Sequence, residues 1–239
     1  MKKNPRLKAF FRQAIYVCLF AFGTLLITSI SYALYLRWFP PFTTPLMLIR
    51  AMEPNRPEGW KLVARWKSYD EIAANAKIAV IASEDQRFAQ HGGFDFEAIE
   101  KAFKANRKSK RVRGGSTISQ QVAKNVFLWP KRSYLRKGLE VYFTFLIETL
   151  WPKERILEMY LNIAEMGDGV FGIQAASRKY FRKDAGYLTA NESALIAACL
   201  PNPRVYKVNK PSAAIVKKQA RILRFMRMIG GKNYLKHME

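Results

Sequence analysis

Two carboxylates stand out by their positions, and the first is Glu84. It follows an apolar segment, residues 78–82. A carboxylate at the end of a buried helix is partly removed from water, which makes it a better proton acceptor. Glu84 is therefore a candidate general base, and a solvated acid paired with Arg87 is the structural alternative. Asp85 and His91 could orient Glu84 or hold the glycine turn that follows them.

The second carboxylate is Glu140, which has three cations close by in the sequence. Arg132, Arg136 and Glu140 are spaced four residues apart, so they share one face of a helix. Lys137 lies three residues before Glu140. Such a face suits a pyrophosphate, with Glu140 orienting the cations or holding a metal. An internal ladder of salt bridges is the structural alternative.

Between these carboxylates, residues 114–117 read Gly-Gly-Ser-Thr and lead directly into a capped helix. Free N–H groups and the helix dipole make such a junction a phosphate site, and nucleotide use is not indicated because the lysine of a Walker loop is absent. The helix that follows has four polar residues on successive turns that could line a groove or form an ordinary exposed face: Gln120, Gln121, Lys124 and Asn125. The basic run 104–113 predicts a mobile segment beside this anion site.

Composition narrows the classes of partner. The 239 residues carry a net charge of +23, which favours nucleic acid, acidic lipid or a phosphorylated substrate. The hydrophobic content of 49% is enough for a folded core. Cys18 and Cys199 are the two cysteines, and Cys18 lies in an apolar run, so no intramolecular disulfide is expected. Two histidines do not make a zinc site of the usual spacing.

The N-terminal third predicts attachment to a membrane. Residues 1–12 are a basic tail, and residues 13–36 contain no charge and are long enough for a transmembrane helix. A cleaved signal peptide is the alternative, although its apolar region is normally shorter. The basic tail places the N-terminus in the cytoplasm, with the remainder outside, which weakens the nucleic-acid interpretation. Residues 37–67 form a proline-rich linker, whose apolar patch 46–49 either packs on the domain or dips into lipid.

The globular part, residues 68–239, predicts a mainly α fold. Ser68 with Glu71 has the pattern of a capping box, which places a helix from Ser68 towards Ser83. A second helix starts near Asp95. Strand signals are few. Further helices are predicted from Ser116 or Thr117, over an amphipathic stretch 135–150, from Pro152 to the glycines at 167–169, over 193–199 after a Thr189–Glu192 capping box, and over 213–229.

These segments together resemble the five signature motifs of the family 51 glycosyltransferases, the peptidoglycan transglycosylases. The similarity covers roughly residues 70 to 205, with all five motifs in order, and the chain leaves no room beyond them for a transpeptidase domain. It is therefore similar to the monofunctional biosynthetic members. The motifs are Glu84-Asp85-x-x-Phe88-x-x-His91-x-Gly93-x-Asp95, Gly115-x-x-x-x-x-Gln121-x-x-Lys124-Asn125, Arg136-Lys137-x-x-Glu140, Lys153-x-x-Ile156-Leu157-Glu158-x-Tyr160-Leu161-Asn162 with Gly167, Gly172, Ala176 and Tyr180-Phe181, and Ala197-Ala198-x-Leu200-Pro201.

The resemblance implies a lysozyme-like, mainly α domain with a small mobile jaw, preceded by one transmembrane helix. It would lie on the periplasmic side of the bacterial inner membrane and polymerise lipid II into β-1,4-linked glycan strands, with inversion and release of undecaprenyl pyrophosphate. Glu84 and Glu140 would be the catalytic residues. Eight residues would bind substrate: Asp85, Ser116, Gln121, Lys124, Asn125, Arg132, Arg136 and Lys137. Glu140 would support the pyrophosphate site, either directly or through a divalent metal, Mg²⁺ or Mn²⁺.

The implied partners are lipid II, the lipid-linked glycan chain and the membrane, together with other proteins of cell-wall synthesis and division, and no nucleic acid. Two alternatives remain: a lysozyme-like lytic enzyme, which needs no cationic wall, and a non-catalytic scaffold, which needs no Glu84. A two-carboxylate glycosidase holds its carboxyl groups about 5 to 9.5 Å apart. A polymerase must fit a sugar and a phosphate between Glu84 and Glu140, so these two should lie farther apart.

Overall fold

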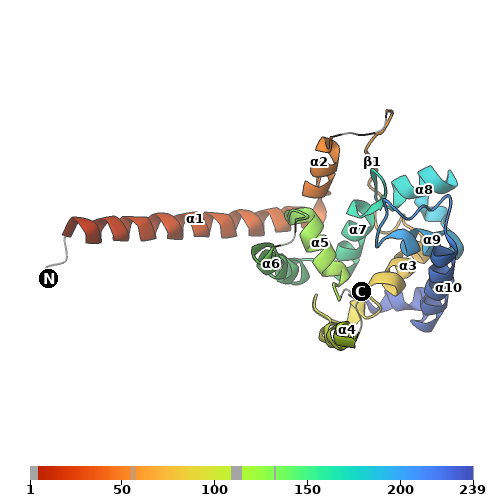
Figure 1. Ribbon diagram of the computed structural model, residues 1–239. Coiled ribbons are helices and arrows are strands. Elements are labelled where there is room, and N and C mark those ends of the chain that lie inside the picture. The colour runs from red at the N-terminus through yellow and green to blue at the C-terminus, as the bar shows by residue number, and fades with distance from the viewer. Residues whose placement is uncertain (1–4, 55, 57, 109–114, 132, 239) are drawn as a thin grey trace. The chain divides into compact units, whose positions relative to one another are not determined.

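The protein is represented by a computed structural model, which describes residues 5–54, 56, 58–108, 115–131 and 133–238. The chain divides into two compact units, one up to Phe39 and the other from Pro40 onwards. The first unit consists of helix α1, Pro5–Trp38 (Figure 1). Its segment Phe10–Trp38 has 29 residues and a mean hydropathy of 2.0. At 1.5 Å per residue this segment is about 44 Å long, more than the ~30 Å of hydrocarbon in a bilayer.

The second unit begins at Pro40, within the segment 37–67 that the sequence assigns to a linker, and the linker itself stays a prediction. Residues 45–52 form helix α2 (Pro45–Met52), which starts with a proline and is capped by Thr44. Met47 is buried, whereas Leu48 and Ile49 are partly exposed and Met52 is 81% exposed. One side of the apolar patch therefore packs on the domain and the other remains available to lipid, so both interpretations of the patch keep some support.

Two groups of helices form the core of the second unit (Figure 1). In one group α3 (Ala74–Glu84), α9 (Ala190–Cys199) and α10 (Ala213–Met228) pack against one another. In the other, α5 (Ile118–Phe127) packs against α6 (Tyr134–Leu150) and α7 (Lys153–Ile163). Residues 76–82 of α3 and 155–163 of α7 are buried throughout, as expected for helices inside a core.

The remaining elements are short, and the predicted mainly α fold is confirmed. A small sheet has the strand order β1-β3-β2, with β1 parallel and β2 antiparallel to β3. These strands contain two or three residues each, so the few strand signals in the sequence are accounted for. The elements are β1 (Val63–Ala64), η1 (Phe88–Gln90), α4 (Phe96–Lys108), β2 (Glu165–Gly167), β3 (Val170–Phe171), α8 (Ile173–Phe181), η2 (Ala185–Tyr187) and η3 (Gly231–His237).

Two predicted helix starts are wrong. Glu71 accepts a hydrogen bond from the Ser68 N–H, as the capping box predicts, but α3 begins six residues later at Ala74. The main-chain bonds in between span three residues and close an isolated turn, for example from the Ile72 N–H to Tyr69 O at 3.1 Å. Helix α9 starts at Ala190, directly after its Thr189 cap, and not at residue 193.

Helix α6 buries polar side chains over its first half, whereas towards its end the apolar Leu146 and Ile147 are buried. Arg136, Glu140 and Thr144 are buried, whereas Leu135 is 70% exposed. Phe145, on the same helix, is also exposed. Exposed apolar surface of this kind is typical of sites that contact another protein or a membrane. Of the predicted mobile run 104–113, residues 104–108 belong to helix α4 and residues 109–113 lie outside the described residues, so mobility of the run stays a prediction.

Candidate active site

The carboxylate of Glu84 is held at both oxygens. Glu84 is the last residue of α3 and is partly buried. Its Oε1 accepts a hydrogen bond from Ser83 Oγ at 3.1 Å, and its Oε2 accepts one from Gln121 Nε2, also at 3.1 Å. Arg87, the partner proposed in the structural alternative, pairs with Asp95 and Glu97. The orientation of Glu84 is thus fixed by neutral donors that leave its charge available.

Tyr160 is a site neighbour that sequence reasoning missed. Tyr160 belongs to α7, and its hydroxyl donates to Gln121 Oε1 at 3.4 Å. Because this bond occupies the oxygen of the Gln121 amide, the NH₂ group of the amide faces Glu84. Burial raises the pKa of Tyr160 well above its usual range, and the charge of Glu84 adds to this. The hydroxyl therefore remains a donor. In the sequence Tyr160 is a member of the fourth motif, but the sequence does not show which group its hydroxyl contacts.

Lys218 on α10 is a second neighbour that the sequence did not single out. Its Nζ donates to Ala198 O at 3.2 Å, at the C-terminal end of α9. Burial lowers the pKa of Lys218, and the nearby charge of Glu84 opposes that shift. A cation close enough to interact with Glu84 thus comes from the opposite end of the chain. In the sequence it looked like one of several cations on a basic amphipathic helix.

Asp85 and His91 hold the backbone around Glu84. Asp85 Oδ1 lies 2.9 Å from His91 Nε2, and Asp85 Oδ2 accepts the Ile118 N–H at 3.0 Å, which ties α3 to the start of α5. His91 Nδ1 accepts the Gly93 N–H at 3.1 Å, so the predicted role in the glycine turn is confirmed. Gly93 has φ +86°, and a Cβ there would lie 2.7 Å from Thr144 Cγ2. This turn therefore requires glycine.

Asp85 and His91, together with Asp95, form a group of possible metal ligands among the described residues. Ligand atoms of Asp85, His91 and Asp95 lie within 4.8 Å of one another. However, both oxygens of Asp85 and both ring nitrogens of His91 are already engaged in hydrogen bonds, and Asp95 Oδ1 accepts the Ala98 N–H at 2.9 Å. The cluster fits a structural network and does not fit a metal site.

The junction before α5 has the predicted capping box, but its N–H groups are not all free. Thr117 Oγ1 accepts the Gln120 N–H at 3.2 Å, and Gln120 Oε1 accepts the Thr117 N–H at 3.0 Å. The Ile118 N–H is bonded to Asp85. Because protein groups occupy these donors, binding of an anion here depends more on side chains than on the helix terminus. Gly114 lies outside the described residues.

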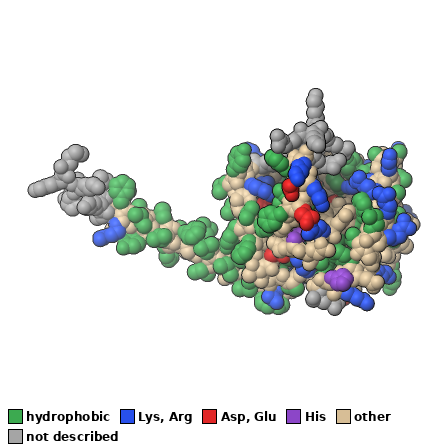
Figure 2. All heavy atoms as spheres, turned by 90° about the horizontal axis from the view of Figure 1, so that it is seen from below, with side chains coloured by type: hydrophobic (Ala, Val, Ile, Leu, Met, Phe, Trp, Pro, Cys, Tyr) green, Lys and Arg blue, Asp and Glu red, His purple; other side chains and the backbone are tan. Residues whose placement is uncertain are grey.

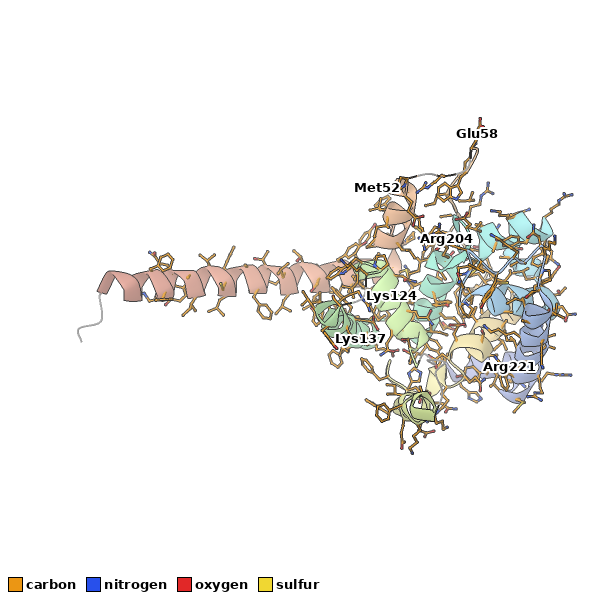
Figure 3. All side chains as sticks on the ribbon, viewed as in Figure 1. Met52, Glu58, Lys124, Lys137, Arg204 and Arg221 are labelled. Carbon is orange, nitrogen blue, oxygen red and sulfur yellow. The ribbon has the colours of Figure 1, made fainter. Side chains whose placement is uncertain are left out.

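Side chains next to this junction line a polar pocket of about 470 Å³. Arg136 Nη1 donates to Glu140 Oε2 at 2.6 Å, and Lys137 donates to the other oxygen of Glu140, so the salt bridges of the structural alternative are present between these three residues. Arg136 Nε is buried and has no hydrogen-bond partner among the described residues. Figure 3 labels Lys124 on α5 and Lys137 on α6. The lining residues are Ser116, Gln120, Gln121, Lys124, Pro130, Arg136, Lys137 and Glu140.

This cationic pocket adjoins a second one that contains Glu84. The second pocket has about 290 Å³ and is lined by residues that include Glu84, Asp85 and Ser116. Ser116 lines both pockets, and Gln121 of the cationic pocket bonds Glu84. The structure thereby brings together most of the residues singled out in the sequence. Asn125, partly buried on α5, lines neither pocket, and Arg132 lies outside the described residues.

Comparison with known proteins gives a consistent picture. Residues 58–227 match the family model described as Transglycosylase. The chain is 50% identical to a "Biosynthetic peptidoglycan transglycosylase" of Bacteroides thetaiotaomicron, over 96% of this chain and 91% of the relative. It is 57% identical to a protein of the same name from Mannheimia succiniciproducens, over 75% and 73% of the two chains. A third relative so named, from Xanthomonas oryzae, is 51% identical over 87% of this chain and 85% of its own length.

Proposed function

The chain belongs to the transglycosylase family and is a peptidoglycan glycosyltransferase that polymerises glycan strands, and we propose that Glu84 is its general base. The cationic pocket of Lys124, Arg136 and Lys137 then binds the pyrophosphate of the donor. In this proposal the acceptor is lipid II and the donor is the growing, lipid-linked chain.

The proposed reaction is a single displacement at C1 of the donor sugar. Glu84 takes the proton from the acceptor's 4-hydroxyl while that oxygen forms a bond to C1. The bond between C1 and the pyrophosphate oxygen breaks, and undecaprenyl pyrophosphate leaves with the electron pair. Attack from the opposite face inverts the α-linkage to a β-1,4 bond. The hydrogen bonds from Ser83 and Gln121 hold the carboxylate for this proton transfer.

The observation that carries the proposal is the unsatisfied guanidinium nitrogen of Arg136. Its Nε is buried in the wall of the cationic pocket without a partner among the described residues, although buried polar groups are normally hydrogen-bonded. A pyrophosphate oxygen would satisfy it, and cations aimed at a leaving group stabilise the charge that develops there. A lytic enzyme, which releases a neutral sugar hydroxyl, has no use for such a wall.

Glu140 is proposed to position these cations. Both of its oxygens contact a cation, and it is the one acid among the residues that line the pocket. A divalent metal prefers several oxygen ligands, so the protein alone does not supply a Mg²⁺ or Mn²⁺ site here. The separation of the Glu84 and Glu140 carboxyl groups stays a prediction: beyond ~9.5 Å, the upper limit of the hydrolase window. A crystal structure with a bound donor analogue would measure it.

The membrane arrangement extends the same proposal. Helix α1 is long and apolar enough for a single-pass anchor, and in Figure 2 the extended helix is covered mostly by hydrophobic side chains. The basic tail at its start supports a cytoplasmic N-terminus, with the catalytic unit on the periplasmic face of the inner membrane. Exposed apolar side chains on α2, α4 and α6, such as Met52, Phe96 and Leu135, would meet the lipid that carries the substrate. Other proteins of cell-wall synthesis and division remain proposed partners.

The deciding experiment is incubation of the detergent-solubilised full-length protein with labelled lipid II. A polymer that lysozyme digests is the expected product. Release of soluble sugar fragments from preformed glycan, without polymer, would favour the lytic alternative. If the protein forms neither polymer nor soluble fragments, that result would favour a non-catalytic scaffold. Addition of a chelator in the same assay tests whether a metal bound together with the substrate is needed.

A further inference from the structure

A third hollow in the catalytic unit has no part in the site described above. It has a volume of about 800 Å³, in the range of ligand pockets, and shares no lining residue with the pockets of Glu84 and Glu140. Its walls come from residues 59–65 around β1, from Asp168, from residues 175–180 of α8 and from residues 203–209. We call it the Trp60 groove.

The Trp60 groove carries an excess of positive charge. One acid lines it, Asp168, and that carboxylate already faces Arg204 at 3.7 Å (Arg204 is labelled in Figure 3). Among the cations, Arg178 pairs with an acid outside the groove. The others have no ion pair among the described residues. An anion in the groove would therefore meet several uncompensated charges, which lowers their mutual repulsion. The lining cations are Lys61, Arg65, Arg178, Lys179 and Lys207.

Aromatic rings give the groove fixed apolar walls. The ring of Trp60 packs on Gly169, which has φ +69°, and a Cβ at that position would lie 2.6 Å from Trp60 Cζ2. The Arg56 guanidinium lies 3.8 Å from the centroid of the same ring, and its Nη2 is buried with no partner among the described residues. Tyr180 is partly buried and donates to Met166 O at 3.5 Å. These contacts hold both rings in place, so the groove has fixed apolar wall area beside its cations.

We propose that the Trp60 groove binds a glycan that carries carboxylate groups, outside the catalytic cleft. Guanidinium and ammonium groups are strong partners for carboxylates, and Asn209 adds an amide for hydroxyl groups. The identity of the glycan rests on the proposed function: the peptide-bearing strand that this enzyme makes is itself an acidic saccharide. The groove would hold finished glycan near the enzyme without taking part in bond formation.

Binding is measured by calorimetry, with full-length protein in neutral detergent and a disaccharide-peptide released from peptidoglycan by lysozyme. Three other probes separate the possible sources of affinity: the same fragment with its carboxyl groups amidated, a neutral chitin tetrasaccharide, and inorganic phosphate. We expect the acidic fragment to bind at least ~10-fold more tightly than the amidated one, since a charged hydrogen bond contributes more than 1.4 kcal/mol, a factor of ten. Equal binding of the two fragments, or tighter binding of phosphate, would overturn the proposal.

A pair of charge reversals locates the binding. Arg65→Glu with Lys179→Glu changes two groove cations, and Lys217→Glu with Lys236→Glu makes the same change in net charge at exposed positions outside it. The first pair should lose at least ~10-fold in affinity and the second less than about twofold, if site contacts rather than net charge hold the ligand. Equal losses would mean non-specific attraction to a basic protein and would end the proposal. Melting temperatures confirm that both pairs are folded.

The same preparations distinguish failure of this proposal from failure of the proposed function. Polymerisation of lipid II by the groove variant should persist, because its substituted residues line neither catalytic pocket. If the parent protein makes no polymer but still binds the acidic fragment through Arg65 and Lys179, the proposed reaction is wrong and the groove stands. If it makes polymer and binds no fragment, the groove proposal alone is wrong.

Discussion

The side-chain amide of Gln121 donates to Oε2 of Glu84 at 3.1 Å and at the same time accepts the hydroxyl of Tyr160 at 3.4 Å. A glutamine amide can flip by 180°, which interchanges the positions of its oxygen and its NH₂ group. A hydroxyl donor on the oxygen side favours the orientation in which the NH₂ group faces the carboxylate. The buried Tyr160 of α7 is thereby linked to Glu84, the proposed general base, through one intermediate residue.

Tyr160→Phe should lower kcat by about fivefold, the effect of losing about 1 kcal/mol of hydrogen bonding, with KM nearly unchanged. The ring and its packing are retained, so the melting temperature should change little. Tyr180→Phe removes a hydroxyl that bonds Met166 O, away from Glu84, and serves as the control.

A double-mutant cycle tests whether Tyr160 acts through Gln121. In a Gln121→Ala background the hydroxyl has no amide to orient, so Tyr160→Phe should then have no further effect on kcat. Effects that multiply independently in the double variant would show that Tyr160 does not work through Gln121.

Glu84→Gln should preserve the fold and lower the rate of polymerisation by at least ~10²-fold if Glu84 is the general base. The amide is similar in size and still accepts one hydrogen bond, but it does not take a proton. Glu97→Gln is a matched control, because Glu97 lines the same pocket and pairs with Arg87. Near-normal turnover by Glu84→Gln would remove this residue from the proposed mechanism.

Arg136→Ala should reduce both turnover and the affinity for pyrophosphate-like inhibitors. It should also destabilise the unit, because it breaks a buried pair with Glu140, and breaking such a pair typically costs about 3–5 kcal/mol. Arg136→Lys should restore stability better than turnover, since an ammonium does not present two aligned N–H groups to phosphate oxygens.

Lys131→Ala, an exposed cation close by in the sequence, is the control for Arg136. Activity of Arg136→Ala at the parent level, measured below its melting temperature, would assign Arg136 to the salt bridge alone.

The sequence predicted the fold class and pointed to most residues of the candidate site because both depend on local patterns. The capping box of Thr117 and Gln120, the buried run before Glu84 and the four-residue spacing of Arg136 and Glu140 are all visible within about two helical turns. The motif order added the family. Each of these features survives in the structure.

What the sequence did not show depends on contacts between distant segments. The neighbours of Glu84 on α7 and α10, Tyr160 and Lys218, are 76 and 134 residues away from it along the chain. The exposure of Leu135 at the start of α6 was also not visible in the sequence, because an apolar stripe normally faces a core. If the protein is anchored in a membrane, as we propose, lipid is a second apolar environment, and periodicity alone does not identify which face of a helix is buried.

Stability at low pH should depend on Asp184. The Gly186 N–H, helped by Gln174 and Lys67 and opposed by burial, lowers the pKa of Asp184 from 3.8 to about 2. Because the pKa of Asp184 is lower in the folded protein than in the unfolded one, its ionised carboxylate stabilises the fold at pH values above the unfolded pKa. This stabilisation is lost as the pH falls through about 2. Asp184→Ala should therefore lower the melting temperature at pH 6, with a smaller difference from the parent near pH 2. Asp70→Ala, which removes an exposed carboxylate, is the comparison variant.

The catalytic unit without residues 1–36 should still bind anionic liposomes. Its basic surface attracts the headgroups, and α2 adds apolar contact through Leu48 and Ile49. Charge attraction is screened over ~8 Å at physiological ionic strength and ~3 Å at 1 M salt, so binding that persists in 1 M salt reports apolar insertion. Leu48→Ser with Ile49→Ser should weaken that salt-resistant part, whereas Val216→Ser, at an exposed apolar residue of α10, should not. If the truncated protein ignores liposomes at every salt concentration, α2 and the residues around it serve only as a spacer.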